Sequence, residues 1–303
     1  HGVQKIRTII KTEAPHIIHC HMKNAHLLAG LAQKRDNLAP LIRTIYNPEQ
    51  LGRDLRTRLC NKYFSHGLIV MTEQTKQSAV KHFFSQERIK VIEPGIDVKR
   101  FSPKRSLNQK PDSIGCLDKF FVIGMVTRIR KTRRLDISLQ VLHQLHQQYP
   151  QLRLLLVGRG RPGAYESVVE KPVSELGIKD LVIPTGYCQG DELVEAFRKM
   201  DVLIYTMPGT DKTCRTVREA MSAGVPVIAP RIGFLPQLIQ DRVSGRLVNL
   251  TPNSFSSALK ELLDAPNYLK ELSQGALESA QKKFDLSVQA EETLQFYERI
   301  MEI

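Results

Sequence analysis

Residues 202–229 read VLIYTMPGTDKTCRTVREAMSAGVPVIA. The apolar run 202–205 predicts a strand, a polar loop containing Gly209 follows, residues 217–223 predict a helix, and residues 225–229 predict a second strand. A strand, a helix and a further strand in this order form the repeating unit of a parallel sheet. Ligands of such sheets bind at the carboxyl ends of the strands, so the loop after residue 205 is a candidate binding loop.

The same alternation of strands and helices continues on both sides of this stretch. Further strands are predicted at 120–126, 152–157, 181–183 and 247–248, with helices at 136–148 and 192–199. A shorter series precedes them, with strands at 17–20, 41–46, 67–72 and 89–92 and helices at 24–34 and 73–84. The polar, proline-flanked segment 102–118 separates the two series. The pattern therefore predicts two doubly wound α/β domains of the Rossmann type.

Composition agrees with a globular protein of about two domains. The chain has 303 residues, of which 42% are hydrophobic and 25% charged, and its formal net charge is +13. A charge of this size indicates an anionic partner, namely nucleic acid, anionic lipid or a phosphorylated substrate. Basic and aromatic residues do not interleave and Trp is absent, which disfavours nucleic acid. The five cysteines form no CxxC pair, which fits a reducing compartment and predicts no metal site.

A basic cluster follows the strand predicted to end at residue 126. It comprises Arg128, Arg130, Lys131, Arg133 and Arg134. Guanidinium groups at the carboxyl end of a parallel strand are well placed to bind phosphates. The two alternatives are a solvated basic loop and a patch for anionic lipid.

Residues 158–163 read GRGRPG and match the G-x-G-x-x-G pattern of dinucleotide sites. This pattern supports an alternative function, an NAD-dependent oxidoreductase. Pro162 is unusual in such a turn, and no acidic residue ends a following strand to hold a ribose. The structural alternative is a glycine-rich turn after a buried strand.

Two carboxylates lie in and after the candidate binding loop. Asp211 is in the loop, and Glu219 lies eight residues later in the predicted helix. Both can accept hydrogen bonds from sugar hydroxyls, and the free N–H groups of the helix N-terminus suit a phosphate. The ordinary alternatives are an N-cap for Asp211 and a solvated helix carboxylate for Glu219.

The segment EAMSAGVPVIA at 219–229 resembles the donor-site motif of retaining family 4 glycosyltransferases. Similar landmarks occur along nearly the whole chain, in the family's order: PHIIHCH at 15–21, VIEPGIDVKRFSP at 91–103, TRI at 127–129 with Arg133, LLLVGRG at 154–160, and Gly186-Tyr187 before Glu192-Leu193. The resemblance implies the GT-B architecture, in which two Rossmann-like domains face a cleft.

The resemblance also implies a domain division. Residues 1–104 would form a partial N-terminal acceptor domain that lacks the family's first βα units, and 105–118 a linker. Residues 119–284 would form the nucleotide-sugar domain, and 285–303 a helix crossing back to the N-terminal domain.

The family's site residues map onto this sequence by position. Arg128 and Arg133 would bind the donor diphosphate, Glu219 the ribose hydroxyls, and Asp211 the donor sugar. Gly186 and Tyr187 would lie near the base. The segment Lys212, Thr213, Cys214, Arg215, Thr216 and Val217 would line the sugar and phosphates.

Three departures from the family pattern stand out. Asp211 is one methylene shorter than the usual Glu, and Lys212, Thr213 and Cys214 replace the usual glycines. Tyr46 stands where the family often has a His near the donor sugar, and His21 is a possible substitute for that His.

The resemblance implies a metal-independent, retaining transferase with no cofactor, in which a nucleoside-diphosphate sugar is the donor substrate. The acceptor would be a glycan, a lipid-linked molecule or a small molecule, in synthesis of envelope polysaccharide or lipopolysaccharide. The net charge fits a cytoplasmic enzyme on the inner face of the plasma membrane, with an anionic membrane surface as partner and no nucleic acid. An inactive, transferase-like binding fragment is a further alternative.

Overall fold

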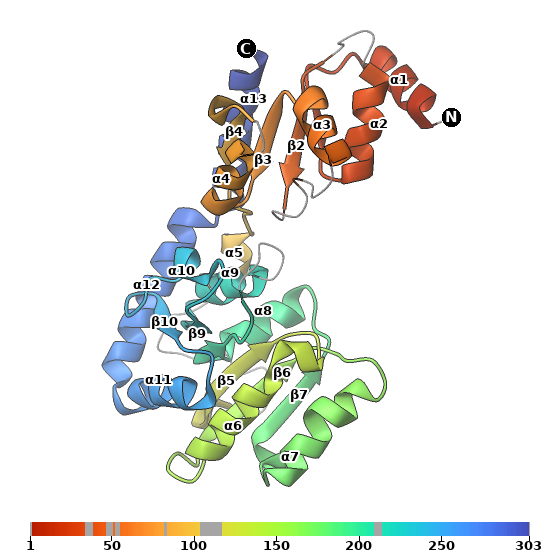
Figure 1. The fold of residues 1–303 in the computed structure, drawn as a ribbon. Helices are drawn as coiled ribbons and strands as arrows, with labels where there is room; N and C mark the ends of the chain where they lie inside the picture. Colours follow the sequence, from red (N-terminus) through yellow and green to blue (C-terminus); the bar gives the residue numbers. More distant parts are fainter. Residues whose placement is uncertain are drawn as a thin grey trace. The chain divides into compact units, whose positions relative to one another are not determined.

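The computed structural model describes residues 2–33, 39–46, 51, 55–81, 84–103, 117–208 and 214–302. The chain divides into two compact units (Figure 1). Unit 1 comprises His1–Gly95 and Leu286–Ile303, and unit 2 comprises Ile96–Asp285. Most of the predicted linker, residues 105–116, lies outside the described residues.

Unit 1 is built on a four-stranded parallel sheet in the order β1-β2-β3-β4. Its strands are β1 (Ile18–Cys20), β2 (Leu41–Ile45), β3 (Gly67–Val70) and β4 (Ile89–Val91). Its helices are α1 (Gly2–Glu13), α2 (Lys23–Gln33), α3 (Leu55–Phe64), α4 (Glu73–Lys81) and α13 (Leu286–Met301). Because all the strand pairs are parallel, the carboxyl ends of the four strands lie at one edge of the sheet.

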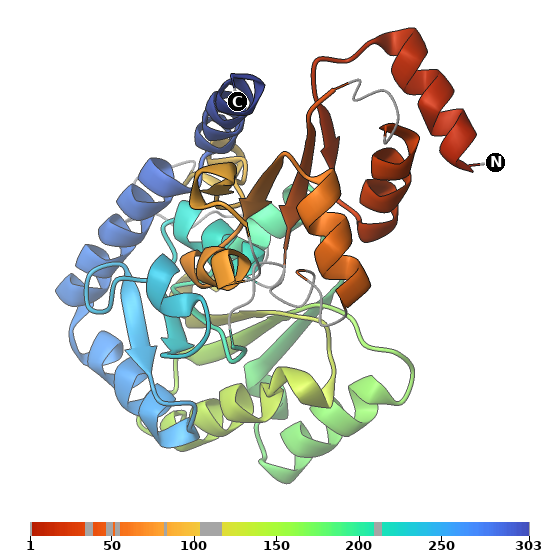
Figure 2. The same ribbon diagram turned by 45° about the horizontal axis from the view of Figure 1, so that its top comes forward.

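The two faces of this sheet bury different residues because successive side chains of a strand point to opposite sides. Leu41 of β2 packs with Ala29 of α2 on one face. Ile42, its neighbour, packs on the other face with Phe296 of α13. Both views show α13, in dark blue, beside β4 (Figures 1 and 2), and Lys90 of β4 forms an ion pair with Glu292 of α13 at 3.8 Å. The C-terminal helix is thus a structural part of unit 1.

Unit 2 contains a six-stranded parallel sheet in the order β10-β9-β8-β5-β6-β7. The strands are β5 (Phe121–Val126), β6 (Leu152–Val157), β7 (Val182–Gly186), β8 (Val202–Ile204), β9 (Val227–Pro230) and β10 (Gly245–Val248). The chain first adds β6 and β7 on one side of β5, then returns to add β8, β9 and β10 on the other side. This is the doubly wound order of a Rossmann fold, and its direction reverses between β5 and β8.

Hydrophobic clusters cover both faces of this sheet. Val122 and Leu155 point into one cluster, which includes Ala220, and Ile123 and Leu154 point into the other. The helices of this unit are α5 (Val98–Phe101), α6 (Leu135–Leu145), α7 (Lys171–Glu175), α8 (Asp191–Arg198), α9 (Arg215–Ser222), α10 (Leu235–Leu238), α11 (Pro252–Asp264) and α12 (Pro266–Lys283). The predicted fold class, two parallel-sheet α/β units of the Rossmann type, is confirmed.

Among the described residues, no helix is both long enough and apolar enough to cross a membrane.

Candidate active site

The candidate site of unit 2 lies where the winding of the sheet reverses. Strands β5 and β8 are neighbours, and the chain leaves them toward opposite sides of the sheet. Ligands of doubly wound sheets bind in the crevice that forms at this point. The loop after β5 contains the basic cluster, and the segment after β8 leads to α9. The sheet order therefore brings the two segments that the sequence singled out to the same edge.

A hydrogen bond joins these two segments directly. The buried hydroxyl of Thr206, two residues after β8, donates to the backbone carbonyl of Arg133 at 2.7 Å. Sequence reasoning did not identify Thr206, because a single Thr after a strand carries no distinguishing signal. Its contact holds the basic loop at the carboxyl end of β8.

Arg128 and Arg133 both lie on this loop. Arg128 is exposed and Arg133 is half-buried. In the described part of the chain, neither side chain has an acidic partner, whereas Arg134 pairs with Asp136 at 3.1 Å. Arg134 also has a left-handed backbone (φ 51°), a conformation that costs a non-glycine residue about 1–2 kcal/mol. The loop is thus held in a costly conformation that leaves two arginines available for an anion.

Glu219 lies on α9 and is 4% exposed. Its Oε1 accepts a hydrogen bond from Nε of Arg215 at 2.8 Å, and Arg215 is itself largely exposed. Burial raises the pKa of Glu219, and the hydrogen bond and charge of Arg215 oppose this effect. Oε2 has no hydrogen-bond partner within the described residues. A buried carboxylate with one oxygen unused is suited to accept hydrogen bonds from a ligand's hydroxyl groups.

The motif EAMSAG at residues 219–224 forms the C-terminal end of α9 and the turn that follows it. Gly224 has a φ of +71°, which glycine adopts without strain. The N–H of Gly224 donates to Met221 O at 3.0 Å, and the N–H of Val225 donates to Ala220 O at 2.9 Å. This is a Schellman motif, and it turns the chain directly into β9. The spacing between Glu219 and Gly224 therefore fixes where Glu219 lies relative to the sheet.

The remaining predicted donor residues are placed as follows. Cys214 is buried directly before α9, and Val217 is buried in the hydrophobic core, so only the backbone of these two residues is available to a ligand. Thr216 is half-buried and Arg215 exposed. Asp211, Lys212 and Thr213 lie outside the described residues, so the sugar contact assigned to Asp211 stays a prediction.

Gly186 ends β7 and Tyr187 follows it, both exposed. They are two strands away from β5, at the same edge of the sheet. The structure thus places Gly186, Tyr187 and the arginine loop along one continuous edge.

The glycine-rich turn at 158–163 follows β6, the second strand of unit 2. In dinucleotide-binding Rossmann domains this fingerprint follows the first strand. Here the first strand is β5, and the basic loop follows it. Gly158 instead serves packing, because a Cβ at this position would lie 1.8 Å from the carbonyl oxygen of Thr127. The position of the turn gives no support to the oxidoreductase alternative.

In unit 1, polar side chains meet at the carboxyl ends of β1 and β2. Nδ1 of His21 lies 2.7 Å from the hydroxyl of Tyr46. The ring of His21 lies 4.2 Å from that of His19, centroid to centroid. His19 is further bound by Tyr297 of α13 at 2.5 Å and by Thr44 at 2.7 Å. The sequence places Tyr46 where the family often has a His and offers His21 as a substitute for that His, and the structure brings these two side chains into contact.

The protonation of this cluster follows from its burial. Burial, with the neighbouring His21, lowers the pKa of His19 to about 4. Burial also raises the pKa of Tyr46 and of Tyr297. His19 is therefore neutral at pH 7, and its ring packs against the ring of the exposed His21. The contribution of Tyr297 could not be found from the sequence, since this residue is 278 positions away from His19.

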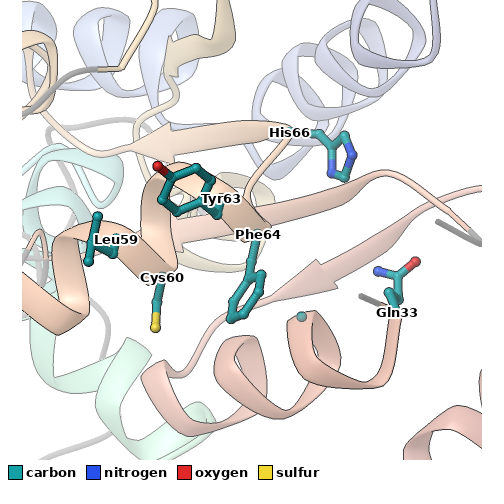
Figure 3. A pocket seen from close by; sticks show the side chains of 7 residues that line it. Gln33, Leu59, Cys60, Tyr63, Phe64 and His66 are labelled. Atoms are coloured by element: carbon teal, nitrogen blue, oxygen red, sulfur yellow. The ribbon is translucent and has the colours of Figure 1, made fainter. Parts of the chain in front are cut away.

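Unit 1 also contains a cavity of about 570 Å³ between α2 and α3 (Figure 3). Its lining residues are Gly30, Gln33, Leu59, Cys60, Tyr63, Phe64 and His66. None of the predicted site residues lines it. His66 precedes β3, and its Nδ1 accepts a hydrogen bond from the N–H of Leu41 at 3.0 Å, a structural role. The cavity therefore lies away from the carboxyl ends of the strands.

The arrangement in unit 2 defines a class of protein. A doubly wound sheet, arginines at the reversal point and a buried carboxylate on the following helix are chemically suited to an anionic ligand that also carries hydroxyl groups. The family model "Glycosyl transferases group 1" matches residues 108–279, more than half of the chain. The chain belongs to this family. A second model, "Glycosyltransferase Family 4", matches residues 2–100.

Curated relatives of the chain are similar over much of its length. A D-inositol 3-phosphate glycosyltransferase of Streptomyces bingchenggensis is 28% identical over 270 residues, which cover 86% of this chain and 55% of the relative. A protein of the same name from Saccharomonospora viridis is 30% identical over 227 residues, covering 71% and 51%. The chain thus spans about half the length of these two relatives.

Solved structures show the same fold. Anabaena Alr3699/HepE in complex with UDP has a TM-score of 0.80 at 18% identity, covering 98% of this chain and 82% of that one. A glycosyltransferase from Rickettsia africae has a TM-score of 0.82 at 17% identity, covering 99% and 81%. These likenesses establish that the two units have the GT-B fold.

Proposed function

We propose that the protein is a glycosyltransferase that moves a sugar from a nucleoside diphosphate to a hydroxyl group of an acceptor, with retention of the anomeric configuration. One observation carries the proposal. The hydrogen bond from Thr206 to Arg133 joins the arginine loop to the segment that leads to the helix of Glu219. Cations for a diphosphate and a carboxylate for hydroxyls are therefore presented from adjoining segments at one sheet edge.

In the proposed reaction, the bond between the anomeric carbon and the diphosphate oxygen breaks. Negative charge then develops on the leaving diphosphate. Arg128 and Arg133 stabilise this charge, together with the free N–H groups and dipole at the N-terminus of α9. Contacts of this kind contribute about 3 kcal/mol each to transition-state stabilisation in closed sites. In this proposal, the arginines stabilise the negative charge that a bound metal ion stabilises in other enzymes.

Glu219 holds the nucleotide in this proposal. Its Oε2 accepts hydrogen bonds from the ribose hydroxyls, while the hydrogen bond from Arg215 to Oε1 favours the charged form and partly opposes the effect of burial. Asp211 contacts hydroxyls of the donor sugar, and Gly186 and Tyr187 lie beside the base. Retention follows from the family resemblance, in which the leaving phosphate takes the proton of the acceptor hydroxyl.

The nucleotide and the acceptor are proposed from the relatives. HepE binds UDP and UDP-glucose in its solved structures, which supports a uridine donor. The curated relatives act, by name, on inositol phosphate, which supports an acceptor that carries several hydroxyl groups. We assign the acceptor to unit 1, where His21 and Tyr46 present polar groups at the carboxyl ends of β1 and β2.

The surroundings of the enzyme are proposed from its charge. A net charge of +13 favours contact with an anionic membrane surface, as in the assembly of envelope polysaccharide or lipopolysaccharide. Cosedimentation with vesicles tests this part of the proposal. Binding to vesicles that contain phosphatidylglycerol, lost at high salt, supports it, and equal recovery with neutral vesicles contradicts it.

Slow donor hydrolysis tests the reaction without a known acceptor. The protein is incubated with UDP-glucose, GDP-mannose or ADP-glucose, and the first-formed sugar anomer is followed by NMR. We expect one donor to release its nucleoside diphosphate together with the α-anomer, because water takes the place of the acceptor. Initial formation of the β-anomer contradicts retention. Absence of release at saturating donor contradicts the transferase activity.

A further inference from the structure

The cavity between α2 and α3 of unit 1 has no role in the proposed function (Figure 3). Its volume of about 570 Å³ falls within the range of ligand pockets, about 300–1,000 Å³. It lies away from the carboxyl ends of the strands, where the donor and the acceptor are proposed to bind. A ligand of this cavity would therefore be a further molecule.

Gln33, at the C-terminal end of α2, presents an N–H donor to this cavity. Its side chain is 6% exposed, and its Oε1 accepts a hydrogen bond from the backbone N–H of Ala39 at 2.9 Å. Because a backbone N–H can only donate, this contact assigns the oxygen to that side and the NH₂ group to the other. In Figure 3 the amide nitrogen lies on the side of His66 and Phe64. Within the described residues, this nitrogen has no hydrogen-bond partner.

His66 presents a second N–H donor for the same reason. Its Nδ1 accepts the hydrogen bond of the Leu41 N–H at 3.0 Å. Burial and the positive charge of Arg88 lower the pKa of His66, so the ring is neutral at pH 7 and carries its proton on Nε2. In the part of the chain that the structure describes, Nε2 has no hydrogen-bond partner. Ala39 and Leu41 are two residues apart, so Gln33 and His66 lie at the same end of the cavity.

The remaining side chains of the lining are mostly apolar and come from α3. They are those of Leu59, Cys60, Tyr63 and Phe64. Leu59 is 42% exposed and Tyr63 is 70% exposed, so apolar surface beside the cavity is open to water. Covering this surface with an apolar group would favour binding. The cavity thus combines two N–H donors at one end with an apolar wall.

We infer that this cavity binds a carboxylate with an aliphatic tail, a ligand of the fatty-acid class. The carboxylate accepts hydrogen bonds from Nε2 of Gln33 and Nε2 of His66, and the tail packs on the apolar side chains of α3. A carboxylate carries only acceptors, which match the two donors, whereas a cationic head group offers no acceptor. The positive charge of Arg88 also favours an anion. The inference does not depend on the proposed function, because it uses no residue of the candidate active site.

Protection of Cys60 from alkylation tests the inference in the wild-type chain. Cys60 lines the cavity, and Cys188 of unit 2, also half-buried, is the internal control. The reaction of each thiol with N-ethylmaleimide is followed by mass spectrometry. The additives are decanoate and decyltrimethylammonium, which has the same tail and the opposite charge, both below their micellar concentrations. We expect decanoate to slow alkylation of Cys60 severalfold and to leave Cys188 unchanged, and we expect decyltrimethylammonium to protect neither thiol.

The variant Gln33→Glu tests the donor directly. It keeps an oxygen for the Ala39 N–H and replaces the NH₂ group that faces the cavity by a second carboxylate oxygen. Because a hydrogen bond to a charged group is lost, the affinity for decanoate should fall by at least about 10-fold. Gln77→Glu, the same change at an exposed site on α4, should match the wild type. The melting temperature of each variant shows whether it is folded.

Three results would overturn the inference. Equal protection of Cys60 by the two additives would mean that the cavity binds apolar tails without recognising a carboxylate. Unchanged alkylation of Cys60 in decanoate would exclude binding in the cavity. Wild-type affinity for decanoate in a folded Gln33→Glu variant would remove Gln33 from the site. If this variant does not fold, the comparison of the two additives on the wild type still decides, and none of these results bears on the transferase activity.

Discussion

Replacing Glu219 by Gln separates the binding role of this residue from its structural role. The substitution keeps the shape of the side chain and removes its charge. Hydrogen bonds to a charged acceptor contribute about 1.5–3 kcal/mol, and those to a neutral acceptor about 0.5–1.5 kcal/mol. Two ribose hydroxyls would then lose about 2–3 kcal/mol together, or roughly 30- to 150-fold in affinity for the nucleoside diphosphate.

The free energy of unfolding should not fall in the Glu219→Gln variant, although its affinity for nucleotide does. Glu219 is buried, and burial raises its pKa above the usual 4.5. The folded state therefore binds the proton more tightly than the unfolded state, and the ionised carboxylate costs stability at pH values above this raised pKa. The ion pair to the exposed Arg215 offsets little of that cost. We expect Glu219→Gln to be at least as stable as the wild type at pH 7.5.

Calorimetric titration with nucleoside diphosphate and urea unfolding together provide the assay. The wild type should also lose nucleotide affinity as pH falls through the pKa of Glu219, whereas the variant should not. Glu271→Gln, the same change at an exposed site on α12, serves as the control. Nucleotide affinity within threefold of the wild type in a folded Glu219→Gln variant would refute the reasoning.

Three further substitutions test the remaining parts of the account. Arg128→Ala should weaken nucleoside diphosphate binding by roughly 10- to 100-fold in calorimetry. Arg130→Ala, on the same loop, should weaken it by less than threefold. Equal losses of affinity in the two variants would indicate that only the net charge of the loop matters and would contradict a specific contact of Arg128. Gly158→Ala should lower the free energy of unfolding by about 2 kcal/mol or more, because its Cβ would meet Thr127 O at 1.8 Å and its φ is +147°; a urea midpoint like that of the wild type would contradict this. Burial lowers the pKa of His26 to about 4, so the unfolded state binds more protons between pH 4 and 6.5 and stability should fall as pH decreases across that window; His26→Gln should reduce this slope in unfolding curves, and an unchanged slope would exclude His26 as its source.

The fold could be predicted from the sequence because strands buried on both faces are continuous apolar runs. Leu152–Val157 was predicted with the bounds that the structure shows, and Phe121–Val126 to within one residue. Helix α3 was missed because its apolar residues are interrupted by polar ones, and four of its ten residues are Arg, Lys or Asn. Helix α1 was also missed, although Ile6 and Ile10 lie at helical spacing. Patterns dominated by polar residues give little information about helices that pack on only one side.

Candidate site residues could be proposed from the sequence where they belong to a short local motif. Glu219, Arg128 and Arg133 were selected because each follows a strand or lies in a helix with a recognisable signature, and their roles stay predictions. Contacts between distant segments were not predictable, and the bond from Thr206 to Arg133 spans 73 residues. Arg159 was considered only as part of a dinucleotide pattern, and its contact with Tyr187 depends on the neighbouring positions of β6 and β7.

One measurement tests the central claim most directly, a thermal-shift series at fixed salt with UDP, GDP, ADP, their common sugar conjugates and NAD. A ligand at 100 times its Kd should add about 2.7 kcal/mol to the stability of the folded state. The account predicts that one nucleoside diphosphate and its sugar conjugate raise the melting temperature, and that NAD does not. Stabilisation by NAD alone, or by no nucleoside diphosphate, would contradict it.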